Sequence, residues 1–370
     1  MIRTVLVANR GEIARRVFRA CRQLGLRTVA VYSEADQGAP HVRDADKAVA
    51  IGGAPARESY LNTDRILAAA RQAGADAIHP GYGFLSESWR FADAVGQAGL
   101  VFVGPTPDAI RKMGDKIEAR RPMSVAGVPV LPGSFEPVAD VAGAEAAAQA
   151  VGFPVMLKAA AGGGGIGMAR VAGAGDLAAA FATAARRAQA AFGTGELYVE
   201  RYLERPRHVE VQVFGDASGT VVHLHERECS IQRRHQKLVE ESPAPGLPPA
   251  VKAGLTAAPV AGARAVGYTN AGTMEFLVDE SGGFYFLEMN ARLQVEHPVT
   301  EEVTGLDLVA AQLRVAGGEL LPWRQDEIPQ RRAAIECRVY AEDPPKGFLP
   351  SPGTLTKLEL GSRTRSFWKP

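Results

Sequence analysis

Short apolar runs alternate with amphipathic stretches through the first 110 residues, and this alternation constrains the fold of the chain more than any other feature. The apolar runs have the length of buried strands and cover residues 4–8, 28–32, 77–79 and 101–103. The stretches with helical periodicity cover residues 12–24, 63–73 and 91–98. Strands that alternate with helices build a parallel sheet, because a parallel connection needs a long crossover. We therefore expect a Rossmann-like, doubly wound α/β domain over residues 1–112.

The first turn between strand and helix argues against a dinucleotide site in this domain. Its sequence is Asn9-Arg10-Gly11-Glu12, which lacks the GxGxxG pattern that lets a backbone approach a pyrophosphate closely. Glu34 and Asp36 follow the second strand and would suit a ribose, but without the glycines they predict little. We expect the domain to serve as a scaffold, and an NAD-dependent dehydrogenase is the weakest interpretation.

The composition excludes some classes of function. Lys and Arg number 42 against 41 Asp and Glu, a formal net charge of +1, whereas nucleic-acid and anionic-membrane proteins carry a basic excess. The three cysteines are far apart and match no zinc or disulfide pattern. No signal peptide or long apolar span is visible. We expect a soluble, cytoplasmic protein without nucleic-acid or membrane partners.

The middle of the chain predicts a small lid over about residues 130–204. Two alanine-rich helical stretches, 139–151 and 174–191, flank a strand at 153–158 that runs into four consecutive glycines. From Arg205 onward, alternating strands, hairpins and Pro-rich turns predict antiparallel structure. The expected domains are 1–112 and 113–330, and the family resemblance described below implies that 331–370 is part of a C-terminal β subdomain.

The segment Thr273–Glu288 predicts a β-hairpin whose strands carry two acids. If the turn is centred between Ser281 and Gly282, Glu275 lies directly opposite Glu288, and Asn290 continues the same face. Two carboxylates and an amide oxygen suit Mg²⁺, which completes its octahedron with phosphate oxygens and water. The alternative is a pair of solvated glutamates in register by accident.

Arg292, Gln294 and Glu296 continue the series of every second residue that starts with Glu288 and Asn290. If the strand extends this far, their side chains share one face, which predicts a polar stripe lining a cavity. The planar fork of Arg292 fits an anion such as bicarbonate, and Glu296 could accept its proton. An ordinary Arg–Glu surface pair is the alternative.

Phosphate ligands are expected where lysines precede flexible backbone. Lys158 ends a strand immediately before the glycine run, which includes Gly163, Gly164 and Gly165, and Lys116 is a second candidate. The run lacks the GKS/T of a Walker loop, and a flexible loop is the alternative.

His208 shares a strand face with Glu210 and Gln212. Further polar candidates are Gln232, His235, Lys237 and Arg338, the last on a half-buried strand where it needs an anionic partner.

These motifs resemble the biotin carboxylase domain of biotin-dependent acyl-CoA carboxylases of the acetyl-, propionyl- and methylcrotonyl-CoA type. The resemblance covers residues 1 to about 360 and is specific, because many long strings occur in the right order. They are ANRGEIARR, AVYSEAD, HPGYGFLSE, MGDK, KAAAGGGG, ERPRHVEVQV, CSIQRRHQK, EESPAPG, EMNARLQVEHPVTE and RVYAED.

The resemblance implies an ATP-grasp fold and assigns roles to the candidate residues. The implied nucleotide ligands are Lys116, Lys158, Gly163, Gly164, Gly165, Glu200, Leu203, His208, Gln232, His235, Lys237, Glu275 and Glu288. The implied ligands of Mg²⁺ or Mn²⁺ are Glu275, Glu288 and Asn290. Bicarbonate is assigned to Arg292, Gln294 and Val295. The implied catalytic residues are Glu296 as base, Arg338 on the biotin enolate, Arg292 and Lys237.

The resemblance also implies a reaction and its partners. Bicarbonate attacks the γ-phosphate of ATP, and the resulting carboxyphosphate yields the CO₂ that carboxylates biotin. Biotin would arrive on a separate carrier protein, since no AMKM motif is present, and a carboxyltransferase subunit would use the product. The sequence departs from the family where Ile166 replaces an arginine. The family's domain also continues for roughly eighty residues more, including dimer contacts. The alternatives are therefore a catalytically impaired ATP-binding fragment and another ATP-grasp carboxylate ligase.

Overall fold

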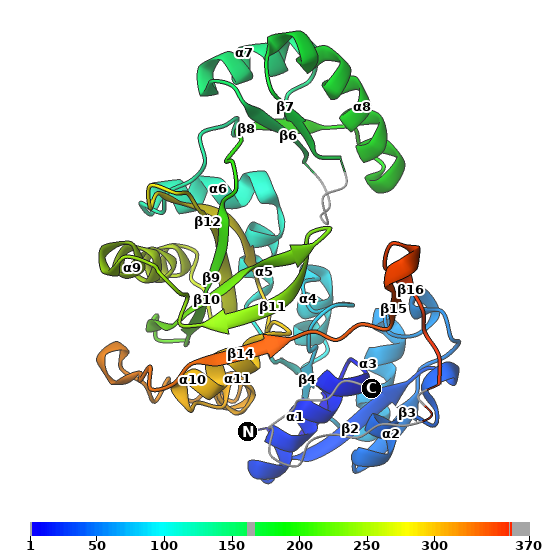
Figure 1. Ribbon diagram of the computed structural model, residues 1–370. Coiled ribbons are helices and arrows are strands. Elements are labelled where there is room, and N and C mark those ends of the chain that lie inside the picture. Colours follow the sequence, from blue (N-terminus) through cyan, green and yellow to red (C-terminus); the bar gives the residue numbers. More distant parts are fainter. Residues whose placement is uncertain (1, 161–166, 355, 357–370) are drawn as a thin grey trace.

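A computed structural model describes residues 2–160, 167–354 and 356 of the protein. Figure 1 shows a broad body, built from the N-terminal domain and a large antiparallel sheet, with a smaller lid above it. Of the sequence predictions, Gly163, Gly164, Gly165 and Ile166 lie outside the described residues.

The N-terminal domain is the parallel sheet that the alternating sequence predicts. Its order is β3-β2-β1-β4-β5, with every neighbouring pair parallel. The strands are β1 (Thr4–Val7), β2 (Arg27–Tyr32), β3 (Lys47–Ala50), β4 (Ala77–His79) and β5 (Val101–Phe102). Its helices are α1 (Gly11–Gln23), α2 (Pro40–Asp44), α3 (Thr63–Ala73) and α4 (Trp89–Gln97). Asn62 and Ser88 cap α3 and α4 through their side chains, as residues of these types do at helix starts.

Two helices connect this domain to the lid. Thr106 caps the first, α5 (Pro107–Gly114), because its hydroxyl accepts from the Ala109 amide. Asp115 then caps α6 (Lys116–Val125) by accepting from two backbone amides.

The lid contains the antiparallel sheet β7-β6-β8, with two alanine-rich helices packed against it (Figure 1). Its elements are α7 (Val141–Val151), β6 (Val155–Ala159), β7 (Ala169–Val171), α8 (Ala174–Phe192) and β8 (Leu197–Arg201). Small side chains such as Ala144 and Ala148 allow the helices to approach the sheet closely. All of these elements lie within residues 130–204, the stretch for which a lid is predicted.

A larger antiparallel sheet, of order β13-β12-β9-β10-β11-β14, follows the lid. Its strands are β9 (Arg207–Gly215), β10 (Val221–Arg233), β11 (Gln236–Ser242), β12 (Asn270–Val278), β13 (Phe284–Asn290) and β14 (Ala334–Cys337). Val209, Val211 and Val213 of β9 face a hydrophobic core that includes residues of helix α9 (Pro249–Ala265). The alternate residues of β9 are left for the opposite, polar face.

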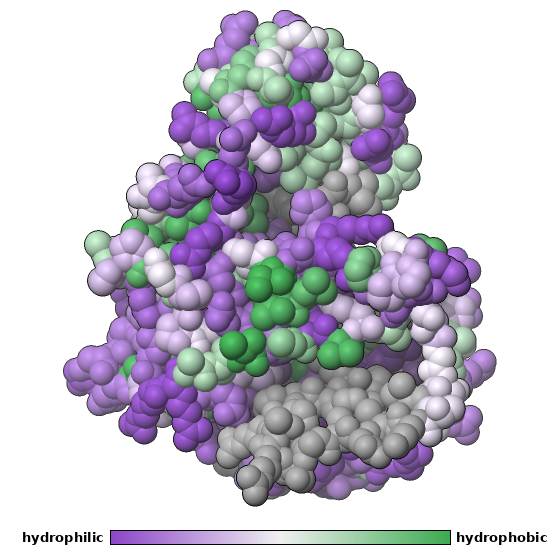
Figure 2. Space-filling model, in the orientation of Figure 1, coloured by the Kyte–Doolittle hydropathy of each residue, from purple (hydrophilic) through white to green (hydrophobic). Residues whose placement is uncertain are grey.

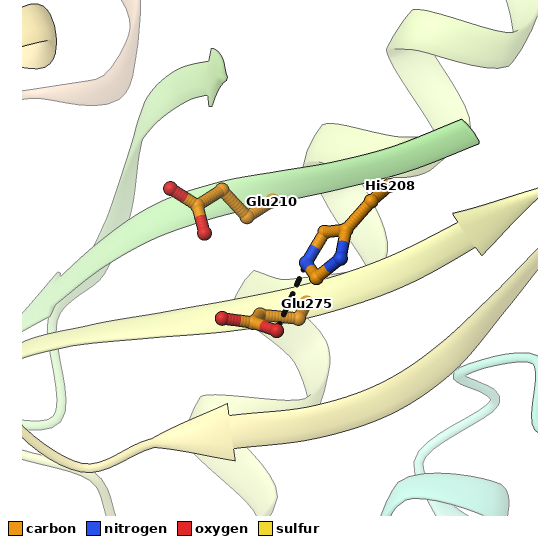
Figure 3. A group of neighbouring side chains, drawn as sticks. All are labelled: His208, Glu210 and Glu275. Atoms are coloured by element: carbon orange, nitrogen blue, oxygen red, sulfur yellow. Dashed lines mark ion pairs between the residues drawn. The ribbon is translucent and has the colours of Figure 1, made fainter. Parts of the chain in front are cut away.

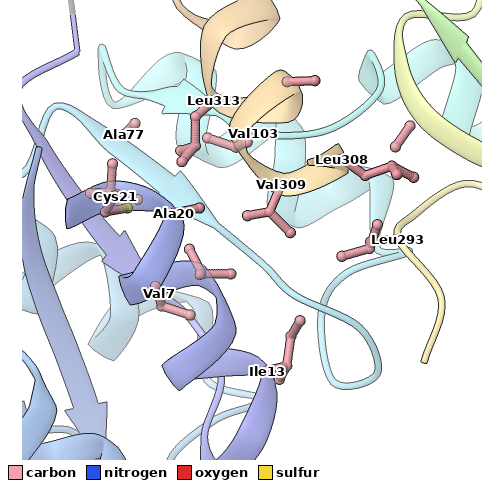
Figure 4. Close-up of a cluster of buried hydrophobic side chains, with 14 of the residues drawn as sticks. Val7, Ile13, Ala20, Cys21, Ala77, Val103, Leu293, Leu308, Val309 and Leu313 are labelled. Carbon is pink, nitrogen blue, oxygen red and sulfur yellow. The ribbon is translucent and has the colours of Figure 1, made fainter. Parts of the chain in front are cut away.

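The antiparallel pairing predicted after Arg205 is confirmed, but three helices that the sequence did not indicate also occur there. Helices α9 (Pro249–Ala265), α10 (His297–Thr304) and α11 (Leu308–Ala316) lie in this region. Helix α11 packs against α1 in a hydrophobic cluster that joins the large sheet to the N-terminal domain, with Val7, Leu308 and Val309 among its residues (Figure 4). Short 3₁₀ turns occur at Glu34–Asp36, Ala56–Glu58, Gln325–Glu327 and Pro344–Lys346.

The last described segment holds the small hairpin of β15 (Glu342–Asp343) and β16 (Leu349–Pro350). Figure 2 shows hydrophobic residues gathered at the surface over the β11–β14 side of the large sheet. Ile335 is 65% exposed and Val339 is 95% exposed there. In the part of the chain that the structure describes, no helix is long and apolar enough to cross a membrane.

Candidate active site

The polar face of the large sheet carries a row of charged residues across four neighbouring strands. Arg227 of β10 is the register partner of Glu210 in β9, Glu210 is the partner of Glu275 in β12, and Glu275 is the partner of Glu288 in β13. The predicted pairing of Glu275 with Glu288 is thus confirmed. The predicted turn centre is wrong, because a bulge after this pair shifts the register so that Phe276 faces Phe286.

Lys237 of β11 supplies the positive charge at the centre of this face. Its Nζ lies 2.5 Å from Glu210, 2.9 Å from Glu275 and 2.7 Å from Glu296. All three carboxylates are buried, and the side chain of Lys237 is 12% exposed. Buried acids of like charge need such a shared cation, because otherwise one or more would take up a proton.

Figure 3 shows His208, Glu210 and Glu275 converging from two adjacent strands. One ligand atom of each lies within 4.8 Å of the others, close enough to hold a metal ion. The Nε2 of His208 pairs with Glu275 at 2.9 Å, and its Nδ1 contacts Gln232 at 2.9 Å. The structure therefore brings together three sequence candidates, His208, Gln232 and Glu275.

Arg292, Gln294 and Glu296 are not alternate residues of one strand, as the predicted polar stripe requires. Strand β13 ends at Asn290, and residues 291–296 form a loop that leads into α10. Gln294 and Glu296 nevertheless reach the site, since Gln294 donates to Glu275 at 3.0 Å. Val295 lies half-buried in the same loop.

Arg292 is held by a residue of the N-terminal domain. Its Nε donates to Glu87 at 2.8 Å, and a terminal nitrogen donates to the side-chain oxygen of Asn290 at 2.8 Å. Asn290 in turn donates its amide nitrogen to Glu275 at 2.9 Å. Glu87 also lines a cavity of about 550 Å³ that reaches Ala160 of the lid segment.

Arg338 closes the site from the C-terminal side. It follows β14 and contacts Glu296 at 2.9 Å and Glu240 at 2.6 Å. The prediction that it needs an anionic partner is confirmed. Glu240 is fully buried, and its burial raises the pKa of its carboxyl to about 6, although Arg338 opposes that shift.

Nearby cations set the protonation of Glu275 and Glu296. Burial raises the pKa of Glu296, but Lys237, Arg227 and Arg338 outweigh burial and hold that pKa at about 2. For Glu275, Lys237 and His208 likewise outweigh burial and hold the pKa well below its usual range. Both carboxylates are therefore ionised at neutral pH, as acceptors of protons or cations must be.

Two of the predicted nucleotide ligands, Lys158 and Glu200, lie in the lid and not in this cluster. Lys158 of β6 contacts Glu200 of β8 at 2.5 Å within the lid, and Arg120 approaches the same carboxylate at 3.5 Å. Leu203 is half-buried between β8 and β9, and His235 is exposed at the β10–β11 turn. Helix α6 begins at Lys116, whose side chain lies outside the described part of the structure.

Three residues of the network were not singled out from the sequence as site residues. Glu210 was identified only as sharing a strand face with His208, and neither Arg227 nor Glu240 was identified. Parity shows which side chains share a face of one strand. The pairing of that strand with distant strands decides which charges meet, and a single sequence carries no signal for it.

Two family models match the chain. The description "Biotin carboxylase, N-terminal domain" matches residues 1–110, and "Carbamoyl-phosphate synthase L chain, ATP binding domain" matches residues 115–324. Among curated proteins, Biotin carboxylase 2 of Bacillus subtilis is 55% identical over 97% of this chain and 81% of its own length. The methylcrotonoyl-CoA carboxylase subunit alpha of rice is 54% identical over 96% of this chain and 48% of its own.

Solved structures agree with these matches. A biotin carboxylase complex with β,γ-ATP from Campylobacter jejuni superposes with a TM-score of 0.93 at 49% identity, over 96% of this chain and 80% of that one. The biotin carboxylase domain of 2-oxoglutarate carboxylase from Hydrogenobacter thermophilus, bound to MgADP, ADP and bicarbonate, gives a TM-score of 0.90 at 49% identity, with the same coverage. With its ATP-grasp architecture and its row of buried acids, the chain belongs to the biotin carboxylase family.

Proposed function

We propose that this protein carboxylates biotin at the expense of ATP, with bicarbonate as the source of the carboxyl group. One observation carries the proposal. Three buried carboxylates share Lys237, and two arginines, Arg292 and Arg338, lie on either side of Glu296 in the chain and contact the network. Such a site can hold a small anion beside a base and exclude bulk water from both.

The base in this scheme is Glu296. It accepts the proton of bicarbonate, and the bicarbonate oxygen then attacks the γ-phosphorus while the bond to the β–γ bridging oxygen breaks and ADP leaves. Arg292 and Gln294 orient the anion. Carboxyphosphate then separates into CO₂ and phosphate, and phosphate takes the ureido proton of biotin as its nitrogen bonds to CO₂. Arg338 stabilises the negative charge that develops on the biotin oxygen.

The residues present fit a divalent cation. Glu275 and Glu288 lie opposite each other on neighbouring strands, and hard oxygen ligands of this kind suit Mg²⁺ or Mn²⁺. Asn290 would add its amide oxygen after releasing Arg292. A cation bound there would neutralise charge on the phosphate oxygens. Lys158 and Glu200 of the lid, with Lys116, Leu203, His208, Gln232 and His235, are proposed to contact the nucleotide.

A different ATP-grasp ligase would share the metal pair and the lid, so the test must depend on biotin. We expect ADP release to require bicarbonate and to rise when free biotin is added, with label from bicarbonate appearing in carboxybiotin. Glu296→Gln should abolish both signals. Glu226→Gln is the matched control, because Glu226 is an equally buried acid that pairs with Lys252 outside the site. ADP release that ignores biotin in the unaltered protein would contradict the proposal.

The partners follow from the same chemistry. We propose that biotin is presented by a separate carrier protein and that a carboxyltransferase subunit consumes the carboxylated product. We also propose a cytoplasmic location, and a homodimer where the C-terminal β subdomain is complete. All three cysteines are unpaired, which is consistent with a reducing compartment.

A further inference from the structure

We propose that Arg227 is a positioning residue for this reaction. Without contacting a substrate, it would set the direction of the Gln294 amide and, through Glu210, the place of Lys237. The proposal rests on the function proposed above for the same site. Arg227 is fully buried, so it has no exposed surface with which to touch bicarbonate, biotin or nucleotide.

Every N–H donor of the Arg227 side chain has an acceptor on a different side chain. Its Nε donates to Glu210 at 2.6 Å, one terminal nitrogen donates to Gln212 and Thr300, and the other to Thr273 and Gln294. A guanidinium carries five such donors in one plane, whereas a lysine carries three on a flexible stem. The surroundings of Arg227 therefore fit a guanidinium and no other cation.

The contact with Gln294 determines which end of that amide faces the site. Arg227 donates to the oxygen of Gln294 at 2.8 Å, and this leaves the amide nitrogen to donate to Glu275 at 3.0 Å. If the amide turned over, its nitrogen would meet the guanidinium and its oxygen would meet a carboxylate. Both contacts would be repulsive. Arg227 thus keeps a donor on the site side of Gln294, as an anion-binding residue requires.

The contact with Glu210 acts on the catalytic lysine. One oxygen of this fully buried carboxylate accepts from Arg227 at 2.6 Å, and the other accepts from Lys237 at 2.5 Å. Lys237 also donates to the base Glu296 at 2.7 Å. A carboxylate held at both oxygens has little freedom to rotate. Arg227 therefore fixes Glu210, and Glu210 fixes the ammonium group beside the base.

The experiment compares Arg227→Met and the milder Arg227→Lys in the full chain. We expect Arg227→Met to raise the KM for bicarbonate about tenfold or more while the KM for ATP changes less than about twofold, with Arg227→Lys in between. The matched control is Arg16→Met. Arg16 is also buried, but it pairs with Glu301 and Asp307 between α1 and α10–α11. It should lower stability without changing the KM for bicarbonate. Equal effects of the Arg16 and Arg227 variants on the two KM values would overturn the proposal.

A double-mutant cycle with Gln294→Ala separates positioning from bulk stability. If Arg227 acts through Gln294, replacing Arg227 in the Gln294→Ala background should raise the KM for bicarbonate much less than it does in the unaltered protein. Independent, additive effects would refute the proposal.

A crystal structure of Arg227→Lys gives a readout that needs no activity. We expect the amide of Gln294 and the Nζ of Lys237 to leave the positions they occupy in the unaltered protein. If both keep their contacts with Glu275 and Glu296, Arg227 does not position them. Absence of biotin-dependent turnover in the unaltered protein would instead refute the proposed function and leave this structural test to decide the role of Arg227.

Discussion

Replacing Lys237 with methionine would leave three buried carboxylates without their shared cation. At separations of 2.5 to 2.9 Å, each pair has a gross attraction of about 6 kcal/mol at an effective dielectric constant near 20. Most of this attraction offsets desolvation, and breaking a buried pair by removing one partner typically costs about 3–5 kcal/mol net. For a chain of this length, that loss lowers the melting temperature by about 4–6 °C.

The assay is differential scanning calorimetry of Lys237→Met at several pH values, with and without Mg²⁺. In the unaltered protein the pKa values of Glu275 and Glu296 are held below their usual range, so the stability from these groups is complete above about pH 4.5 and is lost as the pH falls further. Without Lys237 these pKa values should rise. The variant should then become more stable as the pH falls from about 7 to about 5, because protons neutralise the acids.

Mg²⁺ should also raise the melting temperature of Lys237→Met, since a cation that binds only the folded protein stabilises it. Lys252→Met is the control, because Lys252 pairs with the single carboxylate of Glu226 and should show no response to Mg²⁺. Melting of Lys237→Met within about 1 °C of the unaltered protein would contradict this expectation. So would a variant that acidification does not stabilise.

Three further changes test other parts of the structure. Burial raises the pKa of Glu301 to about 7, so the free energy of unfolding should fall by up to about 3 kcal/mol as the pH rises from about 4.5 to 7; urea titrations of Glu301→Gln should show a flatter profile. Phe276→Ala removes a fully buried ring that packs edge-on against two other phenylalanines, and calorimetry should show a loss of about 3–5 kcal/mol. Lys158→Met, which deprives Glu200 of its lid partner, should raise the KM for ATP about tenfold and that for bicarbonate far less.

The parts of the fold that sequence predicts well are those with a clear period. Apolar runs identified β1, β2, β4 and β5, whereas β3, an edge strand with three of its four residues exposed, was not predicted. Helix α9 was missed because Gly and Pro interrupt its pattern, including Pro259 within the helix. Packing against the large sheet stabilises that helix in spite of its local propensity.

The site was predictable to the extent that it depends on local geometry. The hairpin placed Glu275 opposite Glu288 although the assumed turn was wrong, because the bulge restores the alignment at that pair. The link between Arg227 and Glu210 depends on the pairing of β9 with β10, which bulges between His223 and Glu226. No periodicity within either strand specifies such a shift, so this part of the network required the structure.

The row of charges explains why Lys237 occupies the centre of the site. Like charges directly opposite each other on adjacent strands destabilise a sheet, and here Glu210, Glu275 and Glu288 follow one another across three strands. A sheet selected for stability alone would not retain them. Lys237 supplies the missing charge and makes contact with the same oxygen of Glu275 that accepts from Asn290 and Gln294. A divalent cation bound to that oxygen would have to displace donors from it. Lys237 therefore stabilises these buried acids, and a cation that took over the charge of Glu275 would release Lys237 from this contact.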